Sequence, residues 1–129
     1  MTTNKITSIK SLLQELECGT GLDGYLGLMH NLRLSKEDVL PFCTWNNQHY
    51  TRNLIAKTSQ FELIVMCWEP GQSSPIHSYN NEQGWMYVID GKLNINHYFE
   101  SFGEAKMQYY KDVQLHKGAF LYVNDYLGF

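Results

Sequence analysis

The chain has 129 residues, a formal net charge of −3, 43% hydrophobic residues and 14% aromatic residues. This length suits one folded domain with one core, and so apolar a composition excludes an intrinsically disordered chain. The sequence contains no block of Lys and Arg and no apolar run approaching the roughly 20 residues of a membrane-spanning helix. We therefore expect no nucleic-acid partner and no membrane.

The start of the chain, MTTNKITSIK, has neither the apolar core nor the small-residue cleavage site of a secretory signal. Cys18, Cys43 and Cys67 form neither a disulfide framework nor a CxxC zinc motif. Few and widely spaced cysteines are typical of reducing compartments, so the sequence predicts a cytoplasmic protein. Cys67 lies in an apolar run and is expected to be a buried small hydrophobe.

The first third of the chain has helical periodicity. Apolar residues recur at helical spacing over 7–17, with Thr7 or Ser8 as the cap and Gly19 as the stop. A second helix is predicted over 23–32, and Ser35 begins a short helix that Pro41 should end.

From Tyr50 onward the pattern favours strands. Six are predicted, over 50–55, 60–68, 84–90, 93–99, 107–111 and 119–123, separated by turns that carry glycine. Short strands without helical crossovers indicate a sandwich or small barrel rather than a parallel α/β sheet. We expect Trp45, Trp68 and Trp85 to lie in the core of this β-rich part.

The stretch between the second and third predicted strands contains the candidate chemistry. His77 lies between two apolar runs, after Pro70-Gly71 and before the turn at Asp90-Gly91. Neutral imidazole binds first-row metals well, so His77 is a candidate ligand that points inward. The alternative is a histidine that is hydrogen-bonded at the rim of the core, because polar groups in such positions mark sites only statistically.

The spacing of Gly71, His77, Tyr79, Gly84 and Gly91 resembles the first metal-binding motif of the cupins. The segments Tyr50-Thr51-Arg52-Asn53, Cys67-Trp68-Glu69-Pro70-Gly71 and Ser74-Pro75-Ile76-His77 are similar, more narrowly, to cysteine dioxygenase, a thiol dioxygenase of that superfamily. Tyr122-Val123-Asn124-Asp125 also matches the segment before the last metal histidine of that family.

This resemblance implies a mainly β, cupin-type jelly-roll barrel over residues 1–129, with a helical cap at 1–42 and the barrel portion at 43–129. It also implies a non-haem Fe(II) enzyme that oxidises L-cysteine to cysteine sulfinate with O2. His77 would be the first iron ligand, Arg52 would bind the substrate carboxylate through a bidentate hydrogen-bonded pair, and Tyr50 would be a catalytic-site residue that shapes the pocket.

Two departures keep an alternative open. Tyr79 occupies the position of the second metal histidine, and the third would follow Phe129, where the sequence stops. A catalytically degenerate cupin, which binds a small carboxylate or serves as a structural module, is therefore the second reading. We also expect a barrel that is incomplete at its C-terminal side, with an open edge that favours self-association.

Overall fold

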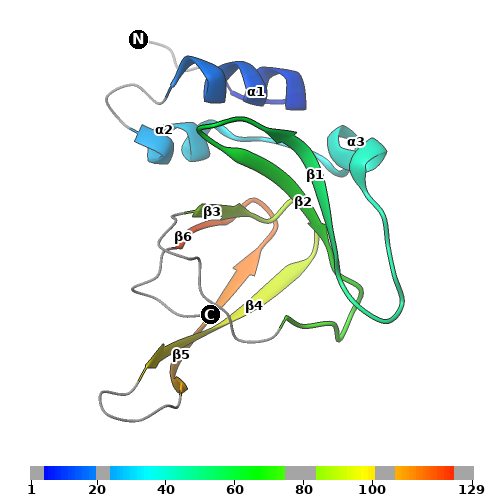
Figure 1. The fold of residues 1–129 in the computed structure, drawn as a ribbon, viewed down its shortest axis with the longest axis vertical. Helices are drawn as coiled ribbons and strands as arrows, with labels where there is room; N and C mark the ends of the chain where they lie inside the picture. Colours follow the sequence, from blue (N-terminus) through cyan, green and yellow to red (C-terminus); the bar gives the residue numbers. More distant parts are fainter. Residues whose placement is uncertain (1–4, 20–23, 75–83, 101–106, 124–129) are drawn as a thin grey trace. The chain divides into compact units, whose positions relative to one another are not determined.

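The structure is a computed structural model that describes residues 5–19, 24–74, 84–100 and 107–123. The chain divides into two units, residues 1–74 and 75–129. The helices of the described residues lie in the first forty-two positions and the strands after Tyr50 (Figure 1). The single-domain organisation that the sequence predicts stays a prediction.

The first helix, α1 (Ile9–Cys18), has the boundaries that its capping residues dictate. Ser8 is the N-cap, and its hydroxyl accepts a hydrogen bond of 3.1 Å from the backbone N–H of Ser11. Gly19 ends the helix with φ +88°, a conformation that a residue with a Cβ rarely adopts. The predicted helix over 7–17 is confirmed with Ser8, not Thr7, as its cap.

The second helix, α2 (Gly24–Asn31), is joined to the segment before α1 by backbone pairing. The N–H of Ile6 donates to Asn31 O at 2.7 Å, and the N–H of Arg33 donates to Ile6 O at 2.8 Å. The helical part of the first unit contains a small set of buried apolar side chains: Ile6, Leu12, Met29, Leu32, Leu34 and Val39. Burial of these side chains is the main contribution to the stability of the helical part.

A short helix, α3 (Lys36–Val39), begins at Ser35, whose backbone N–H donates to Asp38 Oδ2 at 2.7 Å. The sequence predicted that Pro41 would end this helix. The helix does end at Val39, two residues before Pro41, and the chain continues as the 3₁₀ turn η1 (Leu40–Phe42), in which Pro41 occupies the first turn. Proline is tolerated there, since that N–H has no partner within the turn.

The strands β1 (Thr51–Lys57) and β2 (Glu62–Cys67) form an antiparallel hairpin (Figure 1). Thr51 pairs with Cys67, and the register shifts at a bulge between Leu54 and Ala56. Side chains on a strand alternate between its two faces, so residues 52 and 54 share one face and residues 51 and 53 share the other.

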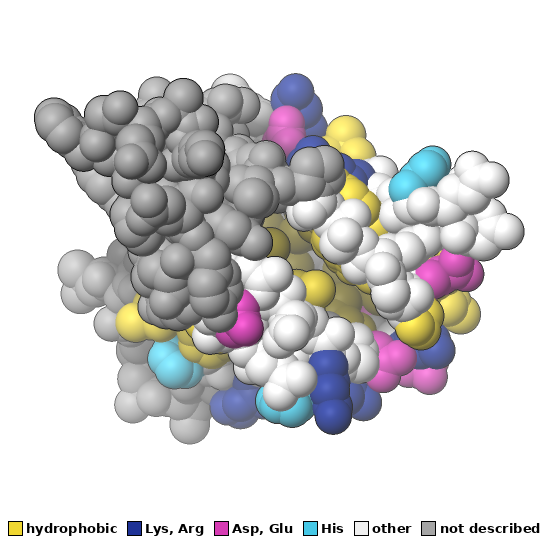
Figure 2. Space-filling view, turned by 90° about the horizontal axis from the view of Figure 1, so that it is seen from below, with side chains coloured by type: hydrophobic (Ala, Val, Ile, Leu, Met, Phe, Trp, Pro, Cys, Tyr) yellow, Lys and Arg dark blue, Asp and Glu magenta, His cyan; other side chains and the backbone are white. Residues whose placement is uncertain are grey.

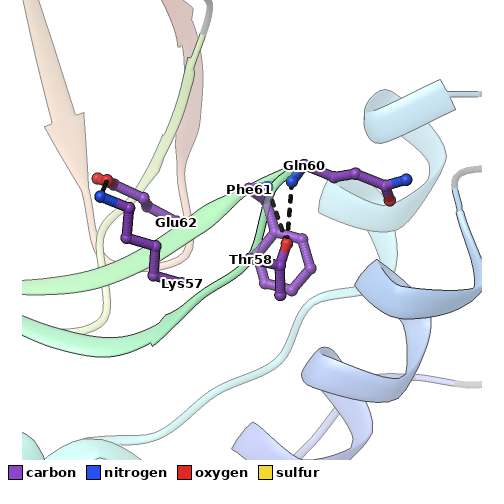
Figure 3. A network of polar contacts seen from close by, with 5 residues as sticks. All are labelled: Lys57, Thr58, Gln60, Phe61 and Glu62. Atoms are coloured by element: carbon purple, nitrogen blue, oxygen red, sulfur yellow. Dashed lines mark hydrogen bonds and ion pairs between the residues drawn. The ribbon is translucent and has the colours of Figure 1, made fainter.

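The turn of this hairpin is held by one hydroxyl (Figure 3). Thr58 Oγ1 accepts 3.1 Å hydrogen bonds from the backbone N–H groups of Gln60 and Phe61, and Thr58 N–H donates to Phe61 O at 2.8 Å. Next to the turn, Lys57 Nζ lies 3.3 Å from Glu62 Oε1. These contacts fix the register of β1 against β2.

The second unit contains two further strand pairs. β3 (Gly84–Tyr87) pairs with β6 (Phe120–Val123), and β4 (Lys92–Glu100) pairs with β5 (Met107–His116), all antiparallel. Val88, Ile95 and Leu115 form the buried centre of this unit.

The second unit also contains two of the predicted glycine turns. Gly91 and Gly118 adopt φ +80° and φ +86° at the turns that the sequence predicts before β4 and after β5. One more glycine turn, predicted between the strands at 93–99 and 107–111, falls at Ser101 to Gly103 and lies outside the described residues.

The predicted mainly β class and all six predicted strands are confirmed. β5 extends to His116 instead of ending at 111, because Val113 and Leu115 continue the alternation and pair with Ile95 and Leu93. Within the described residues the strands form three two-stranded sheets that are not joined into a closed barrel. This arrangement is compatible with a cupin-like fold with an incomplete barrel.

Candidate functional site

The described part of the candidate site lies on one face of the β1–β2 hairpin. Tyr50, directly before β1, stacks on Trp68, directly after β2, with ring centroids 4.2 Å apart and 12° between the ring planes. The stack extends the strand ladder by one residue beyond the Thr51–Cys67 pair. Both aromatic residues are half-buried, so each leaves part of its surface open to a ligand.

Arg52 lies on the same face as Tyr50, one alternation further along β1. It pairs with Met66 of β2, and both side chains are exposed. The face therefore presents a guanidinium beside a thioether and an aromatic stack. A guanidinium has five donors in a fork that fits a carboxylate, and the neighbouring apolar groups suit the rest of a small amphipathic molecule.

The opposite face of the hairpin is polar but packed. Thr44 Oγ1 donates to Asn53 Oδ1 at 2.6 Å, and Thr51 Oγ1 donates to Thr44 O at 2.6 Å. Asn53 Nδ2 donates to Val65 O at 3.2 Å. These bonds attach the segment before β1 to the hairpin. They lie on the face opposite to Tyr50 and Arg52 and help to position the backbone that carries these two residues.

Gln72, in the turn after β2, also fixes the loop before Tyr50. Its Nε2 donates to Asn46 O at 2.6 Å, and its Oε1 accepts from Glu69 N–H at 2.9 Å. Gln72 thus joins the loop before β1 to the turn after β2, the two segments that contribute Tyr50 and Trp68. Gly71 shapes this turn with φ +86°. The Pro70-Gly71 turn is predicted from the sequence, whereas Gln72 was not among the predicted site residues.

The expectation for the tryptophans is correct only in part. Trp68 is half-buried in the stack with Tyr50, and Trp85 packs at a tilt against Phe120 and Tyr122, with centroids 5.9 and 5.0 Å away. Trp45, by contrast, is 55% exposed, because its loop is attached to the hairpin through Thr44 and Asn46 rather than through its ring. The assignment of Trp45 to the core is wrong.

The candidate metal ligands His77 and Tyr79 lie outside the described residues, and so their geometry stays a prediction. Among residues 5–19, 24–74, 84–100 and 107–123, no group of three or more His, Cys, Asp or Glu side chains is arranged to hold a metal ion. The described side chains therefore do not by themselves fit an iron site.

Two other histidines, His49 in the first unit and His116 in the second, are exposed. His49 Nδ1 lies 2.9 Å from Tyr50 O, a local contact at the base of the stack.

On the face drawn in Figure 2, basic and acidic side chains are both spread over the surface. No helix of the described residues is long and apolar enough to span a bilayer.

Comparison with known proteins gives a consistent family. A family model described as "Cysteine dioxygenase type I" matches residues 4–128. Cysteine dioxygenase type 1 of Danio rerio is 28% identical over 67 residues, which cover 51% of this chain and 33% of that protein. The Homo sapiens protein of the same name is 30% identical over 53 residues, 40% of this chain and 26% of the human one. The matched segments thus span about a quarter to a third of these relatives.

Proposed function

Because this chain belongs to the cysteine dioxygenase type I family, we propose that its function is the O2-dependent oxidation of L-cysteine to cysteine sulfinate. In this reaction both oxygen atoms of O2 are added to the thiolate sulfur. The cofactor that we propose is non-haem Fe(II), with His77 as a ligand and Tyr79 at the position of the second ligand. This assignment is supported by the sequence motif and the family, and the proposed location is the cytoplasm.

The observation that carries the substrate assignment is the exposed Arg52 on the same face as the Tyr50–Trp68 stack. In our proposal, Arg52 binds the carboxylate of cysteine through two parallel charge-assisted hydrogen bonds. Tyr50 limits the position of the bound amino acid, and the stack with Trp68 holds the Tyr50 ring in place. Fixing the carboxylate in this way orients the thiol at the other end of the molecule.

A second candidate function is a binding module for small carboxylates that catalyses no oxidation. Tyr79 favours it, because a phenol replaces an imidazole at a position where the family has a metal ligand. Both candidates use Arg52 in the same way, so they differ in turnover and in metal content but not in carboxylate binding.

The first experiment measures L-cysteine binding by anaerobic calorimetry to the full chain and to Arg52→Gln, Arg52→Lys and Lys57→Gln. The last variant is the matched control, since it removes one positive charge from the same strand next to the turn. Loss of a charge-assisted bidentate pair should weaken binding about 10- to 100-fold in Arg52→Gln. Arg52→Lys should recover little of it, because an ammonium lacks the fork geometry.

The second experiment separates the two functions. The chain is loaded with Fe(II), its iron content is measured, and O2 uptake is followed together with the mass of the product. Sulfinate formation that requires Arg52 supports the dioxygenase. Arg52-dependent binding without sulfinate supports the carboxylate-binding module. Equal binding by Arg52→Gln and the unmodified chain would refute both.

The predicted self-association through an open strand edge stays a prediction. β1 and β2 form a two-stranded sheet in the described structure, so each has one edge without a strand partner among the described residues. Sedimentation of the chain at several concentrations would measure such association.

A further inference from the structure

One oxidisable side chain lies directly opposite the guanidinium of the candidate site. Met66 of β2 and Arg52 of β1 are cross-strand partners in the register of the hairpin. The Cβ atoms of residues that face each other in this way are about 4.5–5.5 Å apart, and their side chains project from the same face of the sheet. The thioether of Met66 and the donors of Arg52 are therefore within reach of each other, because both side chains have long, flexible stems.

Met66 is also the methionine that solvent reaches best among those whose side chains the structure describes. It is 37% exposed, whereas Met29 is 7% exposed and Met86 is half-buried. Exposure governs how readily a reagent in solution attacks a sulfur atom. A dilute oxidant should therefore modify Met66 before the other two.

The other positions of the hairpin that adjoin Arg52 on this face carry apolar or aromatic side chains. Its diagonal neighbours across the ladder are Ile64 and Trp68, and Leu54, which is 57% exposed, comes next on the same face of β1. None of these side chains carries a carboxylate. An oxygen acceptor introduced at Met66 would thus meet no competing anion from these adjacent positions.

We propose that Met66 is a reversible oxidation site that controls carboxylate binding by Arg52. This inference rests on the proposed function, in which Arg52 binds the carboxylate of L-cysteine. The oxidant is a hydroperoxide such as hydrogen peroxide. A lone pair of the Met66 sulfur attacks one peroxide oxygen, the O–O bond breaks, and the other oxygen leaves as water after proton transfer. The thioether loses two electrons and becomes a sulfoxide, and the peroxide gains both electrons.

The sulfoxide changes what Arg52 has to bind. In our proposal, the sulfoxide oxygen accepts a hydrogen bond from the guanidinium and occupies donors that a carboxylate needs for its two parallel hydrogen bonds. Because this acceptor is attached to the neighbouring strand, its effective concentration beside Arg52 exceeds that of a dissolved substrate. A methionine sulfoxide reductase reverses the change: two thiols become one disulfide, and the sulfoxide oxygen leaves as water.

The test measures L-cysteine binding by anaerobic calorimetry to the full chain, before and after treatment with hydrogen peroxide. Catalase removes the peroxide, and dithiothreitol then reduces oxidised cysteines but leaves methionine sulfoxide unchanged. Tryptic peptide 58–92 contains Met66 and Met86, and its fragment masses show which sulfur has gained an oxygen atom, while peptide 11–33 reports on Met29. We expect Met66 to be oxidised first, at the same rate at pH 6 and at pH 8, because a thioether has no proton to lose.

Once Met66 is oxidised, L-cysteine binding should weaken about 10-fold, and methionine sulfoxide reductases A and B should restore it. Met66→Leu should have the same affinity before and after peroxide, whatever its starting value, because leucine has no sulfur to oxidise. Met66→Gln places an amide oxygen at nearly the position of the sulfoxide oxygen and should bind weakly without peroxide. Met86→Leu is the matched control, since it removes a methionine of the second unit and should retain the full effect of peroxide.

Three results would overturn the proposal: oxidation of Met29 or Met86 before Met66, unchanged affinity in a chain whose Met66 is fully oxidised, or an equal loss of affinity in peroxide-treated Met66→Leu. Failure of the proposed function is seen separately, because it appears before any peroxide is added. It would be equal binding of L-cysteine by Arg52→Gln and by the unmodified chain, and it would refute the control by Met66 as well.

Discussion

Tyr50 and Trp68 stack face to face across the open end of the β1–β2 hairpin, 4.2 Å between centroids and 12° between planes. Trp68 follows Cys67, the strand partner of Thr51, so the stacked pair lies directly beyond the first paired residues of the hairpin. Arg52 follows Tyr50 by two residues along the chain, so the two side chains lie on the same face of the hairpin.

The stack should be measurable as a coupling energy. Tyr50→Leu, Trp68→Leu and the double variant form a double-mutant cycle in urea unfolding. Stacked aromatic pairs contribute about 1 kcal/mol beyond the area that they bury. The sum of the two single losses in the free energy of unfolding should therefore exceed the loss in the double variant by about that amount. Strict additivity would mean that the rings do not interact in solution.

Gln72 should matter more than an ordinary exposed amide. Gln72→Ala removes the bond to Asn46 O and the bond from Glu69 N–H, and we expect a loss of about 1–2 kcal/mol in the free energy of unfolding. Faster hydrogen exchange in 44–50 should accompany this loss. Gln60→Ala is the control, because the Gln60 side chain points away from the turn and only its backbone is bonded (Figure 3).

Substitutions at the hairpin turn should distinguish the contribution of a hydroxyl group to stability from that of an ion pair. Thr58→Ala should cost about 1 kcal/mol, since Thr58 Oγ1 accepts two backbone hydrogen bonds, whereas Thr58→Ser should retain most of the stability. Glu62→Gln should change the free energy of unfolding by less than about 0.5 kcal/mol, because Lys57 and Glu62 are 65% and 47% exposed. Equal losses for Thr58→Ala and Glu62→Gln would contradict this ranking.

Alkaline pH should destabilise the fold through Cys43. Its pKa is raised in the folded chain to about 11, chiefly by partial burial and then by Cys67, with Lys36 acting in the opposite direction. The folded state therefore holds this proton more tightly than the unfolded state. The associated stability is complete below the unfolded pKa of about 8.5–9 and is lost as the pH rises towards 11. Denaturant unfolding of the reduced chain between pH 8 and 11 should show this fall, and Cys43→Ser should flatten it.

The helical part shows how much local rules determine. Ser8, Gly19 and Ser35 mark helix boundaries that the sequence predicts, because caps act over three or four residues. Pro41 limits α3 as predicted, and the 3₁₀ turn that follows accommodates it without a backbone donor. The six strands were also predictable, as period-two alternation between glycine turns depends only on neighbouring residues.

The sequence by itself determined the family and named Arg52, Tyr50 and His77, because a motif preserves its spacing even where no contact is visible. Only the tertiary structure decided that Trp68 stacks on Tyr50 and that Gln72 joins two loops. These two relationships join residues that are 18 and 26 positions apart. No periodicity records them, since they arise from the hairpin register and from hydrogen bonds between loops that form only when the chain is folded.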